Sequence, residues 1–135
     1  MAIGIVIAAF ATVLATATTS AGPVTCVRTR VATGSSIVGP VVDGTGQVWF
    51  ATEGGDESVV GRIDADGELH VTDLPSDARD IVLGPDGAIW TSSFDSVVRR
   101  WGATGQLLGS FPGVFGDQMV VGPDGNVWAW GINGS

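Results

Sequence analysis

A seven-residue motif occurs twice in the chain almost unchanged, as GPDGAIW at 84–90 and GPDGNVW at 122–128. A looser copy, VDGTGQVW, lies at 42–49. The tryptophans of the three copies, Trp49, Trp90 and Trp128, are therefore 41 and 38 residues apart. A period of about 40 residues is typical of solenoids and of β-propeller blades. The sequence thus predicts a chain built from copies of one structural unit.

A second marker follows the same period. The segment VGRIDADGEL at 60–69 aligns with VRRWGATGQL at 98–107 after a shift of 38 residues. In this alignment Arg62 matches Arg100 and Gly67 matches Gly105. Two independent markers with one spacing make a chance similarity a poor explanation, so we treat the repeat as structural.

Each period contains short runs that are typical of β-strands. DIVLG, AIWTSSF, SVVRRW and QLLGSF are rich in Val, Ile, Trp and Phe, and Asp-Gly, Pro-Asp-Gly and Thr-Gly turns separate such runs. In GPDG, Pro85 presets φ at the first corner, and Gly87 accepts the left-handed conformation. Helical spacing is missing after residue 36. We therefore predict an all-β fold of four-stranded antiparallel propeller blades, with GPDG joining the first strand to the second.

The predicted blades do not complete a propeller. Blade A spans 37–75 and blade B 76–112, whereas blade C at 113–135 has room for its first two strands only. Residues 27–32 predict one more strand upstream, within an N-terminal strand or linker at 23–36. Closed propellers have at least four blades. Three alternatives remain: a fragment of a longer product, copies that complete each other as a homo-oligomer, or an open array, whose unpaired edges favour aggregation unless covered.

The first 22 residues carry no charge and end in small residues, ATATTSAG. This composition predicts a signal peptide and a secreted protein, although no basic residue precedes Arg28. A membrane anchor and a part of the preceding blade are the alternatives. Cys26 is the single cysteine, which excludes an intrachain disulfide, and we expect it to be a small apolar strand residue.

The charge of the chain excludes some classes of partner. The net charge is −8, with 14 acidic residues, and arginine supplies all six of the basic side chains. Nucleic acids and anionic membrane surfaces are recognised by clustered basic residues, so we expect neither as a partner. Most of the aspartates lie in turns, where their side chains bond the local backbone. DADGE at 64–68 lacks the alternating acids of a calcium loop, and no metal site is expected.

The order GPDG-x-(I/V)-W, then GRI-x-x-DG, then LP resembles the blade repeat of the virginiamycin B (streptogramin) lyase family over residues 37–133, and its best copy is residues 60–90. The resemblance implies a β-propeller. In the family, one blade carries Glu-x-His before the turn and a second glutamate after the tryptophan. The histidine moves a proton, and the two glutamates hold Mg²⁺ near the substrate's ester, as suits hard oxygen ligands and an imidazole.

The corresponding slots in this sequence lack that set. For the first acid, the base and the second acid, blade A has Ser36, Val38 and Thr52; blade B has Asp77, Arg79 and Ser93; blade C has Phe115, Asp117 and Gly131. The single histidine, His70, falls in the predicted outermost strand of blade A, where we expect an exposed edge residue. We therefore predict no catalytic residue and no cofactor, with Mg²⁺ implied only for a complete lyase.

Candidate binding residues are those that fill or adjoin the family's slots with charged side chains: Glu53, Asp77, Arg79 and Asp117. The repeated tryptophans and Trp101 are expected to pack in the core between blades. Two functions remain open. One is a secreted, non-catalytic propeller module or fragment that binds an unknown ligand or protein. The other is a piece of a streptogramin lyase-type enzyme, a carbon–oxygen lyase, whose catalytic blade lies outside these residues.

Overall fold

A computed structural model describes residues 2–8, 12–18, 25–30 and 34–131, and in these residues it contains strands and no helix. It therefore offers no helical segment that could cross a bilayer within that part of the chain. Two four-stranded antiparallel sheets lie at its centre. Blade A consists of β4 (Ser36–Val42), β5 (Val48–Glu53), β6 (Val59–Ile63) and β7 (Leu69–Asp73). Blade B consists of β8 (Ala78–Leu83), β9 (Ile89–Ser93), β10 (Val97–Trp101) and β11 (Leu107–Pro112). The predicted four-stranded blades are confirmed.

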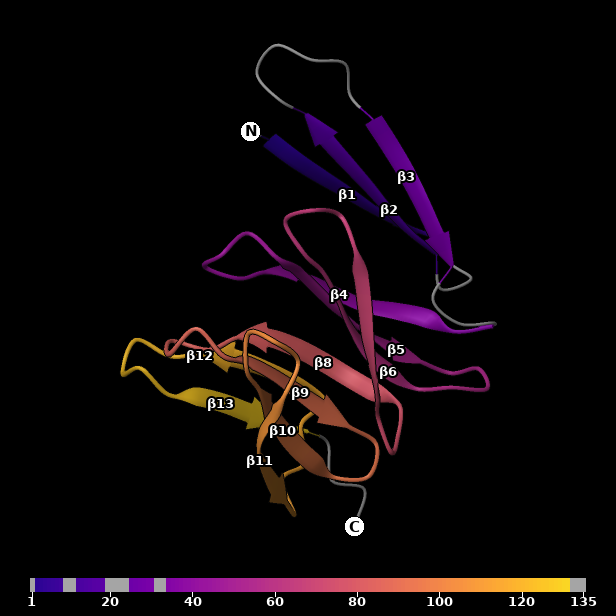
Figure 1. Cartoon of the computed structure of the whole chain (residues 1–135). Helices are drawn as coiled ribbons and strands as arrows, with labels where there is room; N and C mark the ends of the chain where they lie inside the picture. Colours follow the sequence, from indigo (N-terminus) through magenta and orange to yellow (C-terminus); the bar gives the residue numbers. More distant parts are fainter. Residues whose placement is uncertain (1, 9–11, 19–24, 31–33, 132–135) are drawn as a thin grey trace.

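Two smaller sheets flank these blades (Figure 1). The N-terminal sheet contains β1 (Ala2–Ala8), β2 (Thr12–Thr18) and β3 (Thr25–Arg30), in that order. Blade C contains only β12 (Gln118–Val121) and β13 (Val127–Trp130) among the described residues. Contacts of β1 with β4, of β8 with β4 and β5, and of β12 with β8 arrange the sheets as a row that follows the sequence. The described sheets thus form an incomplete propeller.

The N-terminal segment that we predicted as a leader contributes strands to this row. β1 pairs with β2 from Ala2↔Thr18 to Ala8↔Thr12, and β2 pairs with β3. β3 ends at Arg30, and the last two positions of the strand predicted at 27–32 lie outside the described residues, as do parts of the leader. The pairing corresponds to the alternative in which the leader forms part of a preceding blade.

Five turns share one hydrogen-bonding pattern, which explains the repeated motif. In GPDG, the amide of Gly87 donates to the carbonyl of Gly84 at 3.0 Å, and the amide of Gly84 donates to Ala88 at 2.8 Å. Gly87 has a φ of +79°, a conformation in which a side chain is strained. The same bonds recur in the turns that begin at Asp43, Asp64, Gly102 and Gly122. Each blade therefore turns at glycine between strands one and two, and blades A and B do so again between strands three and four.

The main core lies between blades A and B. Trp49, Ala51, Val60 and Leu74 of blade A pack against Ala78, Ile81, Ile89 and Trp101 of blade B. The expectation that Trp49 and Trp101 are core residues is confirmed, because they are 1% and 3% exposed. The other side of blade A buries Val48, Phe50 and Ile63. Gly61 makes room there, since a Cβ on it would lie 2.2 Å from the Phe50 ring.

Two tryptophans depart from the expected burial. Trp90 is half-buried and stacks on Phe111 with ring centroids 5.5 Å apart. Trp128 is 56% exposed, so its prediction as a core residue is wrong. The reason is its neighbourhood: blade B covers Trp49, whereas the described residues include no blade beyond blade C.

Candidate functional site

The strand directions give the row two faces. The turn face carries the glycine turns described above, and the loop face carries the connections from strand two to strand three and from one blade to the next. All of the slots compared with the lyase family lie at the loop face, because the first strand begins there and the second strand ends there. The register places the second-acid slot opposite the residue that lies between the other two slots, as Thr52 is opposite Ile37 and Ser93 is opposite Ala78.

At the loop face, Arg79 forms an ion pair with Asp117. Arg79 is the second residue of β8 in blade B, and Asp117 immediately precedes β12 in blade C. The guanidinium carbon also lies 3.9 Å from the ring centroid of Phe94, within the range of cation–π attraction. Two of the predicted binding residues are therefore brought together, and Phe94 joins them from the end of β9.

A small cavity lies at this ion pair. Its volume is about 40 Å³, and it is lined by Arg79, Ser93, Phe94, Ser96, Phe115, Gly116 and Asp117. A water molecule needs a cavity of about 10–15 Å³ by this kind of measure, so the space suits one small group. Phe94 and Phe115 are 54% and 52% exposed at its margin. The cavity can therefore hold one substituent of a ligand that extends over the two phenyl rings.

Buried polar side chains support this cavity. Arg99 is 7% exposed, and its guanidinium donates to Ser93 Oγ at 3.2 Å and to Asp95 Oδ2 at 2.5 Å. The hydrogen bond from Arg99 is the main cause that holds the pKa of Asp95 below its usual value, against the effect of burial. Ser92 is fully buried, and its Oγ has no hydrogen-bond partner among the described residues. It lies beside Gly116, where a Cβ would approach Ser92 Cβ to 2.9 Å.

The other two predicted binding residues lie apart from the ion pair. Asp77 accepts a hydrogen bond from Ser58 Oγ and its carbonyl accepts one from the Phe94 amide at 3.0 Å, so it links the loops of blades A and B. Glu53 is exposed at the end of β5 and is equivalent to Phe94 of blade B. The structure therefore assigns a linking position to Asp77, and it leaves Glu53 at the surface of blade A.

Sequence reasoning missed Phe94, Phe115 and Asp80. Asp80 Oδ2 accepts a hydrogen bond from the Met119 amide at 2.5 Å, which joins blade B to blade C. One signal was available: Arg79 and Asp117 are separated by 38 residues, the period of the repeat. Equivalent positions of consecutive blades lie side by side, so opposite charges one period apart predict an ion pair between blades.

The Mg²⁺ site of the lyase family does not fit the residues at these slots. Blade B offers one carboxylate, Asp77, and it is engaged by Ser58. Blade C offers Asp117, which is paired with a guanidinium. Blade A offers neutral side chains, Ser36, Val38 and Thr52. Mg²⁺ is bound by carboxylates in octahedral oxygen coordination, and an arginine at the base slot disfavours a cation. No catalytic step through a metal is derived for this site.

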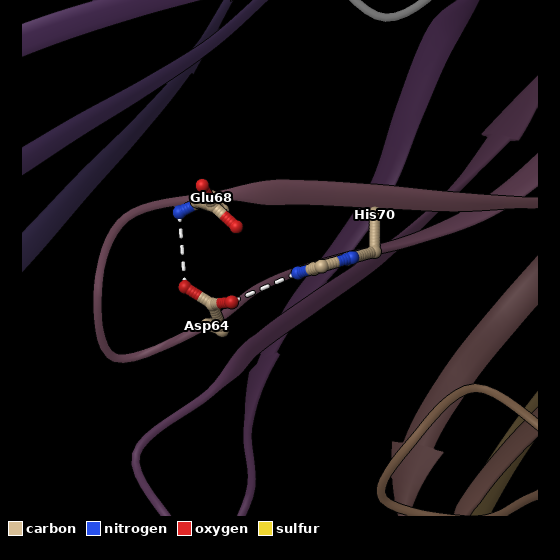
Figure 2. Close-up of side chains that lie close together, drawn as sticks. All are labelled: Asp64, Glu68 and His70. Carbon is tan, nitrogen blue, oxygen red and sulfur yellow. Dashed lines mark hydrogen bonds and ion pairs between the residues drawn. The ribbon is translucent and has the colours of Figure 1, made fainter.

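The only group of metal-ligating type in the described residues lies at the turn face, away from the cavity. Figure 2 shows Asp64 bonded both to Glu68 and to His70. Asp64 Oδ1 accepts the Glu68 amide at 2.9 Å, and Oδ2 lies 2.8 Å from His70 Nε2. The bond to His70 is the main cause that lowers the pKa of Asp64. His70 lies on β7, the outermost strand of blade A, as predicted, and its side chain is 41% exposed. Asp64 holds its ring. These bonds explain the cluster without a metal.

Comparison with known proteins identifies the fold. No family model and no curated protein matches the chain. A streptogramin B lyase structure superposes with a TM-score of 0.67 and 22% identity over 93% of this chain and 46% of its own. A catalytically inactive virginiamycin B lyase from Staphylococcus aureus with quinupristin gives 0.66 and 20% over 94% and 47%. A protein of unknown function from Bacteroides caccae gives 0.54 and 18%. The chain thus spans about half the length of these structures, and it has the β-propeller fold of the streptogramin B lyases.

Proposed function

We propose that the protein is a non-catalytic β-propeller module that binds a ligand or another protein at its loop face. The observation that supports this most directly is the cavity between blades B and C, where Arg79, Phe94 and Asp117 converge. Exposed phenyl rings offer apolar contact area, and the ion pair offers directed polar contacts, as in many ligand sites. The slot in which the lyase family has its histidine is Val38 in blade A, Arg79 in blade B and Asp117 in blade C. A guanidinium does not accept a proton at physiological pH, and the Asp117 carboxylate is paired with that guanidinium.

Quinupristin is the probe that separates binding from catalysis, because a structure of a related fold was determined with it. The full chain is incubated with quinupristin and Mg²⁺, and the compound is followed by mass spectrometry. We expect its retention time and fragmentation pattern to stay unchanged, because ring opening by elimination would give an isomer of the same mass. Ring opening that persists in the His70→Ala variant would contradict the proposal and support the alternative, a part of a lyase-type enzyme.

Binding at the loop face is tested by calorimetry with the same compound, using Arg79→Ala and Phe94→Ala. We expect each substitution to weaken binding about tenfold or more, because each removes one wall of the cavity. Arg62→Ala is the matched control, since Arg62 lies at the turn face and bonds Gln47 at 2.7 Å. Equal loss in all three variants would place any binding elsewhere. An absence of binding by the unsubstituted chain would exclude this class of ligand and leave protein binding as the role of the face.

We also propose that the protein is exported. The uncharged, apolar composition of residues 1–22 supports export, and the pairing of β2 with β1 and β3 favours retention of this segment in the folded protein. Expression in a bacterium followed by fractionation and intact mass spectrometry distinguishes the outcomes. We expect a protein of 13.7 kDa outside the cytoplasm. A product that begins near Gly22 would show a cleaved signal peptide, and a cytoplasmic protein would contradict export.

A further inference from the structure

Blade C exposes an apolar face whose equivalent in blade A is buried. Side chains alternate along β13, so that Val127 and Ala129 are half-buried toward blade B, whereas Trp128 and Trp130 point away from it and are 56% and 51% exposed. Val120 on β12 is 47% exposed. We call Val120, Trp128 and Trp130 the end face. Single exposed apolar residues are common, but two tryptophans and a valine on neighbouring strands mark a contact surface.

The repeat itself shows what covers such a face. Trp128 is equivalent to Trp49, and Trp130 is equivalent to Ala51. In blade A these two positions are 1% and 0% exposed, because Ile81, Ile89 and Trp101 of the following blade pack over them. We call the side of a blade that faces the next blade in the sequence its forward side, and the opposite side its backward side. The contact is heterologous, because the forward side of one blade meets the backward side of the next. The end face therefore fits the backward side of another propeller blade.

A second copy of the chain can supply that side. The N-terminal sheet lies at the other end of the row from blade C (Figure 1). No sheet in the described residues precedes it in the row, so none packs on its backward side. A repeated heterologous contact closes into a ring where its rotations complete one full turn, and it gives an open filament where they do not. The chain covers 46% of the streptogramin B lyase chain, and twice 46% is 92%, so two copies supply about one such propeller.

We propose that two copies of this chain associate head to tail, with the N-terminal sheet of each copy packed on the end face of the other. Two such contacts close a ring that contains both copies of blades A and B and of the two smaller sheets. Closure covers both of the row's ends at once, which an open array cannot do. The proposal uses the chain with residues 2–30 retained.

The oligomeric state of the full chain tests the closed ring. Sedimentation velocity is measured from about 1 to 100 µM. We expect one species of 27.4 kDa, twice the chain mass of 13.7 kDa. A monomer throughout this range would overturn the proposal, and so would a series of growing polymers, because these indicate contacts that do not close.

Matched variants locate the contact. We expect Trp130→Glu to weaken dimerisation at least a hundredfold, since it places a carboxylate in the end face. Val71→Glu is the control, because Val71 on β7 is also 51% exposed but lies outside this face. Circular dichroism establishes that both variants keep their strand content. If both variants dissociate alike, or neither does, the end face is not the contact. Val120→Glu is the replacement if Trp130→Glu does not fold.

The head-to-tail arrangement is tested without any substitution at the end face. Cys26 in β3 is the single cysteine, and a benzophenone maleimide attached to it reports what lies near the N-terminal sheet. After irradiation and cleavage at arginine, we expect dimer cross-links between the Cys26 peptide and the peptide 101–135 of the other copy. A dimer that cross-links Cys26 only to the other copy's N-terminal peptides would overturn the head-to-tail contact.

Discussion

Blades A and C have nearly the same local sequence and opposite environments. Both place a tryptophan three residues after the glycine of a turn, and in both the indole Nε1 donates to an aspartate of that turn. Trp49 is 1% exposed and Trp128 is 56% exposed. The local motif therefore determines the turn and the direction of the side chain, whereas the neighbouring blade determines burial. The same position of the repeat therefore contributes to the core when another blade covers it, and it forms an exposed apolar surface when none does.

The largest difference is expected when the two tryptophans are truncated. Trp49→Ala should lower the free energy of unfolding by about 3–5 kcal/mol, because it leaves a cavity between blades A and B. Trp128→Ala should lower it by less than about 1 kcal/mol in the monomer. Urea denaturation of both variants, at a concentration where the protein is monomeric, gives the comparison. Similar losses would mean that blade C is covered in solution.

The aspartates that bond these indoles should differ in the same direction. Asp43 is 7% exposed and accepts the Trp49 indole at 2.8 Å, whereas Asp124 is exposed and accepts Trp128 at 3.2 Å. Asp43→Asn should reduce stability by about 1–3 kcal/mol, since a buried charge-assisted hydrogen-bond network loses its acceptor. Asp124→Asn should leave the urea midpoint unchanged within error. A larger loss for Asp124→Asn would reverse the comparison.

Acid should weaken the fold through Asp43 of blade A. Burial raises the pKa of Asp43, but the hydrogen bonds from Thr45, Trp49 and Gln47 outweigh it and hold the pKa below its usual value. A carboxyl group with a lowered pKa stabilises the fold above its unfolded pKa of about 4, and this stabilisation is lost as pH falls through the folded pKa. Stability measured by urea from pH 6 to pH 2 should therefore fall below pH 4. Asp43→Asn should flatten this fall, and a parallel curve would show that other carboxyl groups cause it.

The smallest effect is expected at the turn face. Asp64 and His70 are bonded at the surface of blade A, and Asp64 has a lowered pKa with His70 as the main cause. His70→Gln should change the thermal midpoint by no more than about one or two degrees, since exposed ion pairs contribute little. Added Zn²⁺ or Mg²⁺ should leave the midpoint of the unsubstituted protein unchanged. A rise with metal that His70→Gln abolishes would make the cluster a binding site.

The sequence predicted the features that depend on a few neighbouring residues. The glycine turns, the strand order within a blade and the core positions of Trp49 and Trp101 follow from local chemistry and from the repeat. The exposure of Trp128 could not be predicted in this way, because it depends on whether a further blade packs on blade C. The repeat implies such a blade, and the described residues contain none. The edge position of His70 was predicted correctly, but its bond with Asp64 was not, because Asp64 reaches it across a turn. Of the predicted binding residues, Arg79 and Asp117 meet because they lie one period apart, and a pattern search within a single blade does not find such pairs.

The order of the strands has a consequence for how the chain folds. Each described strand pairs with the strand immediately before or after it in the sequence, and each of the two complete blades is a meander of four. Strand pairing with chain neighbours gives low contact order, and low contact order is associated with fast folding. During synthesis, a blade can acquire its hydrogen bonds as soon as its fourth strand emerges. Blade A would then provide a finished surface on which the first strand of blade B condenses, so that growth of the row proceeds in the direction of translation.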